Sequence, residues 1–373
     1  MFILTANLLT SSKIADGLFE SSRYLLGGVR GGLGLITIVI AVAFSATIGV
    51  VGAGVVTMGM LALPTLLRVG YKPELATGVV VASGSLGILF PPSIMLFTMG
   101  ALTGVSVARL SIAVIIPGLV LASCYMLYTF VICQIRPELG PAMSPEETAE
   151  MPKKKWIISA LVGLLPPVIL IVGVLGSIFF GIATPTEASA IGAVVAFLLT
   201  ILYRKCSWQM VRTALLDTMK TTAMIFMLIF AASAFTSIFF AIGGAHMIVN
   251  FVTTLDLSRW LVFAFMCIVV FTLGLFLDWF GVVMIVLPIF MPIMDMYGFD
   301  RLWVVVVMSV LMQTCFLTPP FGLAIFYLKQ IAPEHNAGMM FRSAFPFILI
   351  IIVVTVLCIV FPQLVTFLPG RMW

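Results

Sequence analysis

Charge is scarce in this chain. Of its 373 residues only 9% are Asp, Glu, Lys or Arg, whereas 62% are hydrophobic and the mean hydropathy is +1.26. Soluble proteins usually carry about 25% charged residues, so the composition excludes a soluble enzyme and indicates a polytopic protein of the lipid bilayer. A nucleic-acid-binding protein needs a basic stripe with aromatic residues, and the sequence contains none.

Metal-binding and redox-active residues are also few. The chain has two histidines and six cysteines, no CxxC pair occurs, and most of the cysteines lie inside apolar runs. A cysteine in such a run behaves as a small apolar residue. The sequence therefore favours neither a zinc site nor a disulfide framework, and no nucleophile–base pair indicates an enzyme.

Long stretches without any charged residue dominate the chain. A membrane span needs roughly 20 apolar residues to cross about 30 Å of hydrocarbon. Most of the uncharged stretches predict single spans, including one over 110–135 and a final one over 343–368. The full set is 31–67, 75–108, 110–135, 156–186, 188–203, 221–255, 302–328 and 343–370, with 260–294 interrupted only by Asp278.

Two of these stretches are too long for one span. Residues 31–67 would form a helix of roughly 55 Å, and both this stretch and 260–294 have glycines near the middle. We predict two re-entrant helical hairpins, over 31–67 and 260–294, each entering and leaving on one side of the membrane. Backbone turns are tolerated at depth where they are buried in protein or line a cavity. The alternative is two full spans joined by a minimal turn.

The distribution of basic residues supports the hairpins. If both hairpins are re-entrant, only four of the 19 Lys and Arg residues lie on one side of the membrane: Arg109, Arg259, Arg301 and Arg371. The positive-inside rule makes the other side cytoplasmic, and the hairpins then point at each other from opposite faces. The amphipathic segments 13–26 and 207–219 are interpreted as interfacial helices. Residues 136–155 form a cytoplasmic linker between the halves 1–135 and 156–373.

The two halves share an internal repeat. Pro64, Gly70 and the pair Pro91-Pro92 recur after a constant offset as Pro292, Gly298 and the pair Pro319-Pro320. Because the halves cross the membrane in opposite directions, this is an inverted-topology repeat, which is common in secondary transporters.

Each proline pair lies inside an uncharged segment. Proline lacks the amide donor and clashes with the preceding turn, so we predict broken helices over 75–104 and 302–328. Freed carbonyls suit Na⁺, and half-helix N-termini suit a carboxylate. The alternative is a pair of proline kinks that only aid packing. The predicted substrate-binding residues around the breaks are Ser83, Ser85, Pro91, Pro92, Ser93, Thr318, Pro319 and Pro320.

Two acidic residues allow more than one interpretation. Asp278 is the single carboxylate within a hydrophobic hairpin, where burial costs about 2.5–3.5 kcal/mol. It either lies beside a cation site or caps the turn of the hairpin. Glu187 follows Thr184 and Thr186, either of which could cap the start of a helix; the alternative is a functional role for Glu187.

Several motifs together resemble the large permease subunit of the tripartite ATP-independent periplasmic (TRAP) transporters. The resemblance covers almost the whole chain. It is carried by Gly70-Tyr71, Ser83–Gly87, Pro91–Ser93, Ile116–Gly118, Ala183–Ala188, Gly274 to Asp278, and Phe316–Gly322.

The resemblance implies an all-α polytopic membrane protein with the elevator fold of the ion-transporter superfamily. It implies Na⁺-coupled import of an organic acid across the bacterial inner membrane, with no cofactor beyond the coupling ion. The implied partners are a separate small membrane subunit and a periplasmic substrate-binding protein. The implied Na⁺-binding positions are Gly49, Gly52, Gly84, Gly87, Asp278, Thr314 and Thr318.

The chain departs from the family pattern in two places. Many members have serines at the first hairpin tip, whereas this chain has Ile48-Gly49-Val50-Val51-Gly52, so backbone carbonyls would have to serve there. The first residues resemble the end of a family span, which leads us to expect that leading scaffold helices are missing. The sequence does not identify the organic acid, because no inward arginine is evident.

Two other functions remain open from the residues alone. A stand-alone cation-coupled carboxylate symporter has the same requirements in the membrane, and genes for the two partners beside this one would decide against it. An ion channel or respiratory subunit needs a continuous polar pore or a relay of intramembrane His, Lys and acidic residues, and only Asp278 is clearly placed for that.

Overall fold

The computed structural model describes residues 1–12, 26–48, 51–143, 165–244 and 258–372, with the single positions 163, 247, 250 and 254. These residues are helical with connecting turns and contain no strand, which confirms the all-α prediction. Five helical segments among them are long and apolar enough to cross a membrane: Val51–Arg68, Val107–Ile135, Trp208–Ala241, Trp279–Met296 and Ala337–Val360. The predicted interfacial helix 13–26 and most of the linker 136–155 lie outside the described residues.

The first repeat begins with a pair of packed helices. Helix α3 (Gly32–Ile48) and helix α4 (Val51–Arg68) are separated by only two residues and contact each other. The segment predicted as a broken helix contains α5 (Pro73–Ser85), the short 3₁₀ helix η1 (Leu86–Ile88) and α6 (Ile94–Thr103). Helices α7 (Val107–Ala113) and α8 (Ile115–Ile135) follow.

The second repeat has the same order of elements. Helices α15 (Arg259–Gly274) and α16 (Trp279–Met296) pack together. The interrupted segment then contains α17 (Arg301–Leu311), α18 (Gln313–Leu317) and α19 (Leu323–Ile331), and α20 (Ala337–Val360) follows. Both Pro–Pro peptide bonds, at Pro91-Pro92 and Pro319-Pro320, are cis. Two short helices, α21 (Gln363–Thr366) and α22 (Pro369–Met372), close the described chain.

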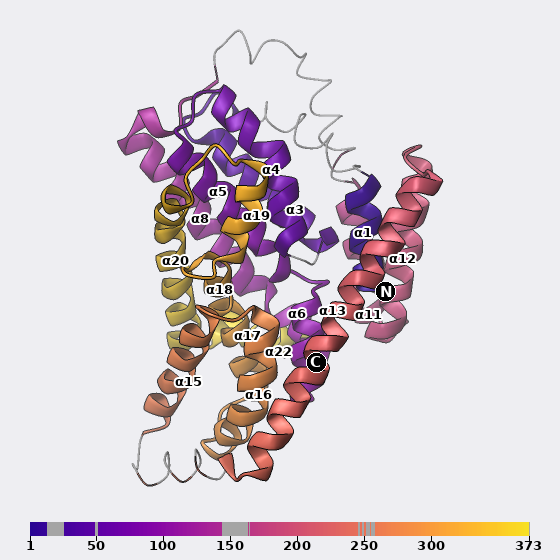
Figure 1. The fold of residues 1–373 in the computed structure, drawn as a ribbon, viewed down its shortest axis with the longest axis vertical. Coiled ribbons are helices and arrows are strands. Elements are labelled where there is room, and N and C mark those ends of the chain that lie inside the picture. Colours follow the sequence, from indigo (N-terminus) through magenta and orange to yellow (C-terminus); the bar gives the residue numbers. More distant parts are fainter. Residues whose placement is uncertain are drawn as a thin grey trace.

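The two repeats form one body with a continuous apolar core. The largest cluster of buried side chains runs through α3–α8 and α15–α20, and these helices occupy one side of Figure 1. The body is also joined by polar contacts. The Arg301 guanidinium binds both carboxylate oxygens of Asp295, at 2.8 and 2.6 Å, and donates to the Thr103 carbonyl at the end of α6.

A second layer has separate cores. Helix α1 (Phe2–Ser12) packs against α12 (Pro185–Leu202) and α13 (Trp208–Ala241). Their buried residues, including Leu9, Leu199 and Met210, form a cluster apart from the main core, and a small third cluster joins this layer to Ala108 of α7. Figure 1 shows α13 running obliquely along the main body, and it packs there against α16.

The structure settles one question about a helix start. The Thr184 side chain accepts from the Glu187 amide, while the Glu187 carboxylate accepts from the Thr184 amide at 2.7 Å. This reciprocal capping box satisfies two amides that would otherwise lack partners at the start of α12. The interpretation of Thr184 as a helix cap is confirmed.

Two predicted boundaries differ from the structure. Residues 207–219 do not form a separate interfacial helix; they are the first part of the 34-residue α13, which contains neither glycine nor proline to interrupt it. The segment predicted as the final span is α20, which runs over Ala337–Val360 rather than 343–368. It begins early because Asn336 caps it, and it ends early because Pro362 disfavours a helical conformation at Phe361.

Candidate solute- and cation-binding site

The start of α4, the start of α16 and both helix interruptions border a single pocket. Its volume is about 80 Å³, which is enough for on the order of half a dozen water molecules. Helix α13 of the second layer forms the remaining wall. The lining residues among those described are Val51, Gly52, Ile88, Ile94, Thr221, Met224, Ile225, Leu228, Asp278, Trp279, Phe280, Phe316, Leu323 and Tyr327.

Four helices begin at this pocket. Val51 is the first residue of α4, Ile94 of α6, Trp279 of α16 and Leu323 of α19, and all four line the cavity. The first amides of a helix lack partners within it, and a helix N-terminus carries a partial positive charge of about +0.5. The pocket is therefore surrounded by backbone dipoles that favour an anion.

Local contacts fix two of these helix starts. The Ser93 hydroxyl accepts from the Leu96 amide and donates to the Ile88 carbonyl, so it bridges η1 and α6. At the second interruption, Gly322 has a left-handed backbone with φ +41°, and a Cβ added there would lie 2.5 Å from the Phe341 ring. Only glycine fits this position without strain and a clash.

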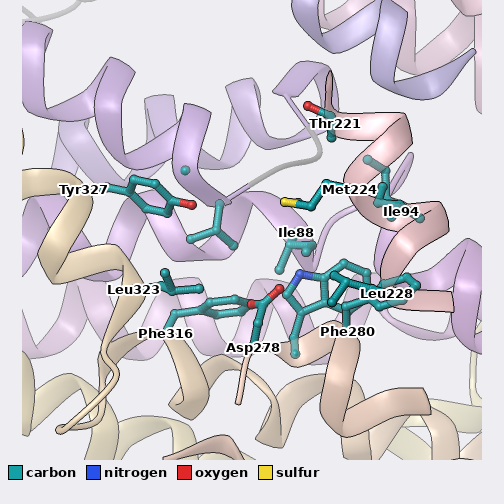
Figure 2. Close-up of a pocket in the computed structure, with 14 residues that line it drawn as sticks. Ile88, Ile94, Thr221, Met224, Leu228, Asp278, Phe280, Phe316, Leu323 and Tyr327 are labelled. Atoms are coloured by element: carbon teal, nitrogen blue, oxygen red, sulfur yellow. The ribbon is translucent and has the colours of Figure 1, made fainter. Parts of the chain in front are cut away.

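Asp278 projects its carboxylate into the pocket. It occupies the N-cap position of α16 with an extended backbone, but its side chain makes no capping hydrogen bond. Figure 2 shows the carboxylate directed towards the same space as the Tyr327 hydroxyl, with Met224 on the opposite helix. One interpretation from the sequence was that Asp278 caps the hairpin turn. Its position at the start of α16 agrees with that interpretation, but its side chain makes no capping bond.

Both helix pairs contact α19 or the residues just before it. The Phe321 amide donates to the Leu275 carbonyl at 3.2 Å, which joins the second hairpin to the start of α19. A Cβ added to Gly52 would lie 2.9 Å from the Tyr327 ring, so α4 and α19 pack at glycine distance. Movement of either helix pair would therefore alter the walls of the pocket.

The other predicted residues lie around the pocket rather than in it. Of the predicted site residues in the described part of the chain, Gly52 and Asp278 line the cavity. Gly49 lies outside the described residues. Pro91, Pro92 and Ser93 adjoin the start of α6, and the exposed Pro319 and Pro320 follow Thr318 at the end of α18.

The predicted hydroxyl groups satisfy their own helices. Ser83 donates to the Val80 carbonyl, Ser85 to Ala82, Thr314 to Leu311 and Thr318 to Thr314. Their oxygens keep lone pairs for a further partner, because a hydroxyl donates once and accepts twice.

The predicted glycines allow close packing of helices. A Cβ on Gly84 would lie 2.8 Å from the Val55 Cα atom, and one on Gly54 would lie 2.8 Å from the Gly84 carbonyl oxygen. Helices α4 and α5 therefore meet backbone to backbone at this point. Gly87 is buried within η1.

Sequence reasoning missed the wall contributed by α13 and the part of α19 that carries Tyr327. Thr221, Met224, Leu228 and Tyr327 belong to ordinary apolar runs, and no motif distinguishes them. Gln313, at the start of α18 just before the second break, is another residue that sequence reasoning did not select. It is fully buried, its amide nitrogen donates to the Ser309 carbonyl, and its oxygen has no partner.

The described residues contain no group of three or more His, Cys, Asp or Glu side chains that could hold a metal ion. A cation bound here would depend on carbonyl and hydroxyl oxygens with at most one carboxylate. Such oxygen ligands suit a hard, weakly held cation.

Repeated helix pairs, interrupted helices and a pocket shared between them define a helical membrane transport protein. Over residues 1–364 the chain matches the family described as the tripartite ATP-independent periplasmic transporter, DctM component. The chain therefore belongs to this family: it is a TRAP transporter large permease, and it is not an enzyme.

Characterised relatives agree with this assignment. The chain is 31% identical to the C4-dicarboxylate TRAP transporter large permease protein DctM of Pseudomonas aeruginosa, over 99% of this chain and 84% of that protein. It is 28% identical to the sialic acid large permease SiaM of Vibrio cholerae and 29% identical to the ectoine/5-hydroxyectoine large permease UehC of Ruegeria pomeroyi, over the same shares.

A solved structure supports the fold. The YdaH transporter of Alcanivorax borkumensis aligns with a TM-score of 0.64 over 95% of this chain and 83% of that chain, at 17% identity. At this identity the comparison bears on the fold alone.

Proposed function

We propose that this protein is the large membrane subunit of a Na⁺-coupled system that imports an organic acid across the bacterial inner membrane. A periplasmic binding protein delivers the solute, and a separate small membrane subunit completes the transporter. The relatives are named for C4-dicarboxylate, sialic acid and ectoine transport, and each of these solutes carries a carboxylate.

The convergence of four helix N-termini on one pocket carries the proposal. No Lys or Arg is among the described residues that line it, so backbone amides and dipoles have to neutralise a bound carboxylate. Helix N-termini perform this task for anions in general and for substrate carboxylates in transporters with interrupted helices.

The coupling ion binds where hairpin turns meet helix interruptions. On one side the proposed ligands are backbone oxygens at Gly49 and Gly52, together with those of the interruption at Gly84–Gly87. On the other side they come from Thr314 and Thr318, with Asp278 supplying the formal negative charge beside them. Each Na⁺ that enters the cell releases about 2.3 kcal/mol per 100 mV of membrane potential. This free energy makes Na⁺ entry a sufficient driving force for solute uptake.

Transport proceeds by an elevator movement of the main body against the layer of α1, α12 and α13. Two observations support this. The two parts have separate apolar cores, and the pocket lies between them, with α13 as one wall. The hairpins are re-entrant in this proposal, and its support is that α4 and α16 both begin at the pocket beside the helix interruptions.

Uptake into proteoliposomes tests the function. The permease, its small subunit and its binding protein are reconstituted together, and uptake of labelled succinate, sialic acid and ectoine is measured. We expect accumulation of at least one solute with an inward Na⁺ gradient and none when K⁺ replaces Na⁺. Equal accumulation without Na⁺ would contradict the proposal.

Removal of the pocket charge tests the cation site. Asp278→Ala should lower the rate of Na⁺-driven uptake about tenfold or more, because losing a charged contact costs about 1.5 kcal/mol or more. Asp217→Ala, on the exposed part of α13, is the control and should transport normally. If the Na⁺ concentration dependence of Asp278→Ala equals that of the parent protein, Asp278 takes no part in the cation site.

A further inference from the structure

The turn between α12 and α13 carries exposed basic residues without acidic partners. Arg204 and Lys205 lie in the turn, and Arg212 follows in the second turn of α13. Within the part of the chain that the structure describes, none of these three residues, here called the basic cluster, forms an ion pair. The one acid nearby in the sequence, Asp217, lies 3.8 Å from Lys220. In Figure 1 the turn lies at the upper end of the two helices.

The backbone of Arg204 is unusual for an arginine. Its φ is +54°, the one positive value at a non-glycine position among the described residues. The turn is tightly bonded there, since the Arg204 amide donates to the Ile201 carbonyl and the Lys205 amide to the Thr200 carbonyl, both at 2.9 Å. Helices usually end with glycine at such a position, because other residues are strained there. An exposed, strained arginine points to a role for its charge.

The start of α13 presents an apolar stripe beside the basic cluster. Trp208, Leu215 and Met219 lie on the same helix face as Arg212, at spacings of four, seven and eleven residues. Trp208 is 80% exposed. Met210 lies on the opposite face and is buried in the core shared with α1 and α12. Basic residues with apolar side chains on an exposed helix face are typical of the membrane interface, where tryptophan is enriched.

The length of α13 places this stripe at the level of the lipid headgroups. The helix has 34 residues and is about 51 Å long, whereas the hydrocarbon core measures about 30 Å. Residues 221–241 contain no charge and are long enough to cross the core alone. Residues 208–220 therefore reach the headgroup region, on the side of the membrane predicted to be cytoplasmic. Anionic lipids of that leaflet attract basic residues near its surface.

We propose that the basic cluster and Trp208 bind anionic phospholipids of this leaflet. The phosphates lie among the basic side chains, and the acyl chains lie along the stripe of Trp208, Leu215 and Met219. Because Met210 joins the start of α13 to α1 and α12, bound headgroups anchor all three helices to one leaflet. This inference goes beyond the proposed function and does not depend on the solute or the coupling ion.

Thermal unfolding of the full-length permease in detergent tests the lipid class. Phosphatidylglycerol should raise the midpoint more than phosphatidylcholine with the same acyl chains, and the difference should shrink at high salt, which screens exposed charges. Glycerol 3-phosphate should have no effect. The lipid concentration that gives half of the increase measures the affinity.

Replacement of the basic cluster tests the site. Arg204→Gln, Lys205→Gln and Arg212→Gln should each weaken phosphatidylglycerol binding about fivefold, and the triple variant about 100-fold. Lys72→Gln is the matched control, because Lys72 is an exposed basic residue already paired with Glu138 at 2.9 Å. It should keep the affinity of the parent protein.

Arg204→Gly separates the charge from the backbone strain. Glycine adopts a positive φ without steric cost, so this variant should unfold at or above the parent temperature when no lipid is added. The same variant should bind phosphatidylglycerol about fivefold more weakly. A purely structural role for Arg204 predicts the opposite pattern, with lower stability without lipid and unchanged lipid affinity.

The remaining outcomes each contradict the inference. Equal stabilisation by both lipids overturns it, and so does a phosphatidylglycerol affinity that persists in the triple variant. Stabilisation by glycerol 3-phosphate as strong as by the lipid would identify a site for a free phosphate. Loss of the lipid effect when the small subunit is purified with the permease would identify a protein interface. No solute is present, so none of these outcomes affects the proposed function.

Discussion

Close packing against a neighbouring helix requires glycine at position 274. Gly274 ends α15 directly against α18, and a Cβ there would lie 2.1 Å from the Cys315 sulfur. Both residues lie next to elements that form the pocket. The cysteine is buried and acts here through its size, which agrees with its interpretation as an apolar residue from the sequence.

Gly274→Ala should therefore destabilise the protein. Overpacking of a close contact costs typically about 1–3 kcal/mol, which outweighs the small gain in helix propensity. We expect a lower midpoint of thermal unfolding in detergent. Gly281→Ala is the control, because its nearest atom would be 3.7 Å away, and it should unfold at or above the parent temperature.

Relief of the contact checks the cause. Adding Cys315→Ala to Gly274→Ala removes the clashing sulfur and should recover part of the lost stability. If the double variant is less stable than the sum of the single effects predicts, the clash is not the reason for glycine at this position.

At the scale of elements, capping determines where the helices around the pocket begin. Ser93 both caps α6 and satisfies the Ile88 carbonyl of η1, so one side chain holds both halves of the first interruption. Ser258 also occupies an N-cap position, at α15, but its side chain makes no capping bond. A serine at the N-cap therefore stabilises the start of α6 more than the start of α15.

Ser93→Ala should cost about 1 kcal/mol from the lost cap, and more because the buried Ile88 carbonyl loses its donor. Ser258→Ala should change stability far less. Thermal unfolding of the two variants, measured side by side, checks the difference. Equal effects would show that the Ser93 bridge does not stabilise the interruption.

At the scale of the whole molecule, two parts meet along α13. The main body has one continuous core through both repeats, whereas α1, α12 and α13 have their own. Within each part, polar contacts bridge distant segments: Thr77 and Ser343 hydroxyls lie 3.1 Å apart in the main body, and Asn7 donates to Thr218 at 3.0 Å in the other layer.

Cross-linking tests whether the two parts move. In a background without native cysteines, Leu228→Cys on α13 and Phe280→Cys on α16 are joined with a short bifunctional thiol reagent. We expect the linked protein to lose Na⁺-driven uptake, because the main body can no longer slide past α13. Thr77→Cys with Ser343→Cys links two segments of the same body, and transport should continue.

The outcome of this comparison is direct. Uptake that survives the link between Leu228→Cys and Phe280→Cys contradicts an elevator movement along α13. Loss of uptake in both linked proteins would instead indicate that internal flexibility of the main body is required.

The sequence by itself determined the environment, the secondary structure and the repeat. A chain with 9% charged residues has to bury its backbone polar groups in helices within a bilayer. Proline pairs at matched positions have to interrupt helices wherever they lie. The same local reasoning limited the helix cap to Thr184 or Thr186, because a cap and its partners are only three residues apart, and the structure selects Thr184.

Only the tertiary structure decided which residues share the pocket. Tyr327, Met224 and Asp278 are far apart in the chain and meet because the two repeats fold around each other and α13 lies across them. The long α13 also replaced an expected separate helix at 207–219, since amphipathic composition indicates a surface but not where a helix ends. Contacts between distant segments depend on the packing of whole elements, and spacing along a single sequence does not record that packing.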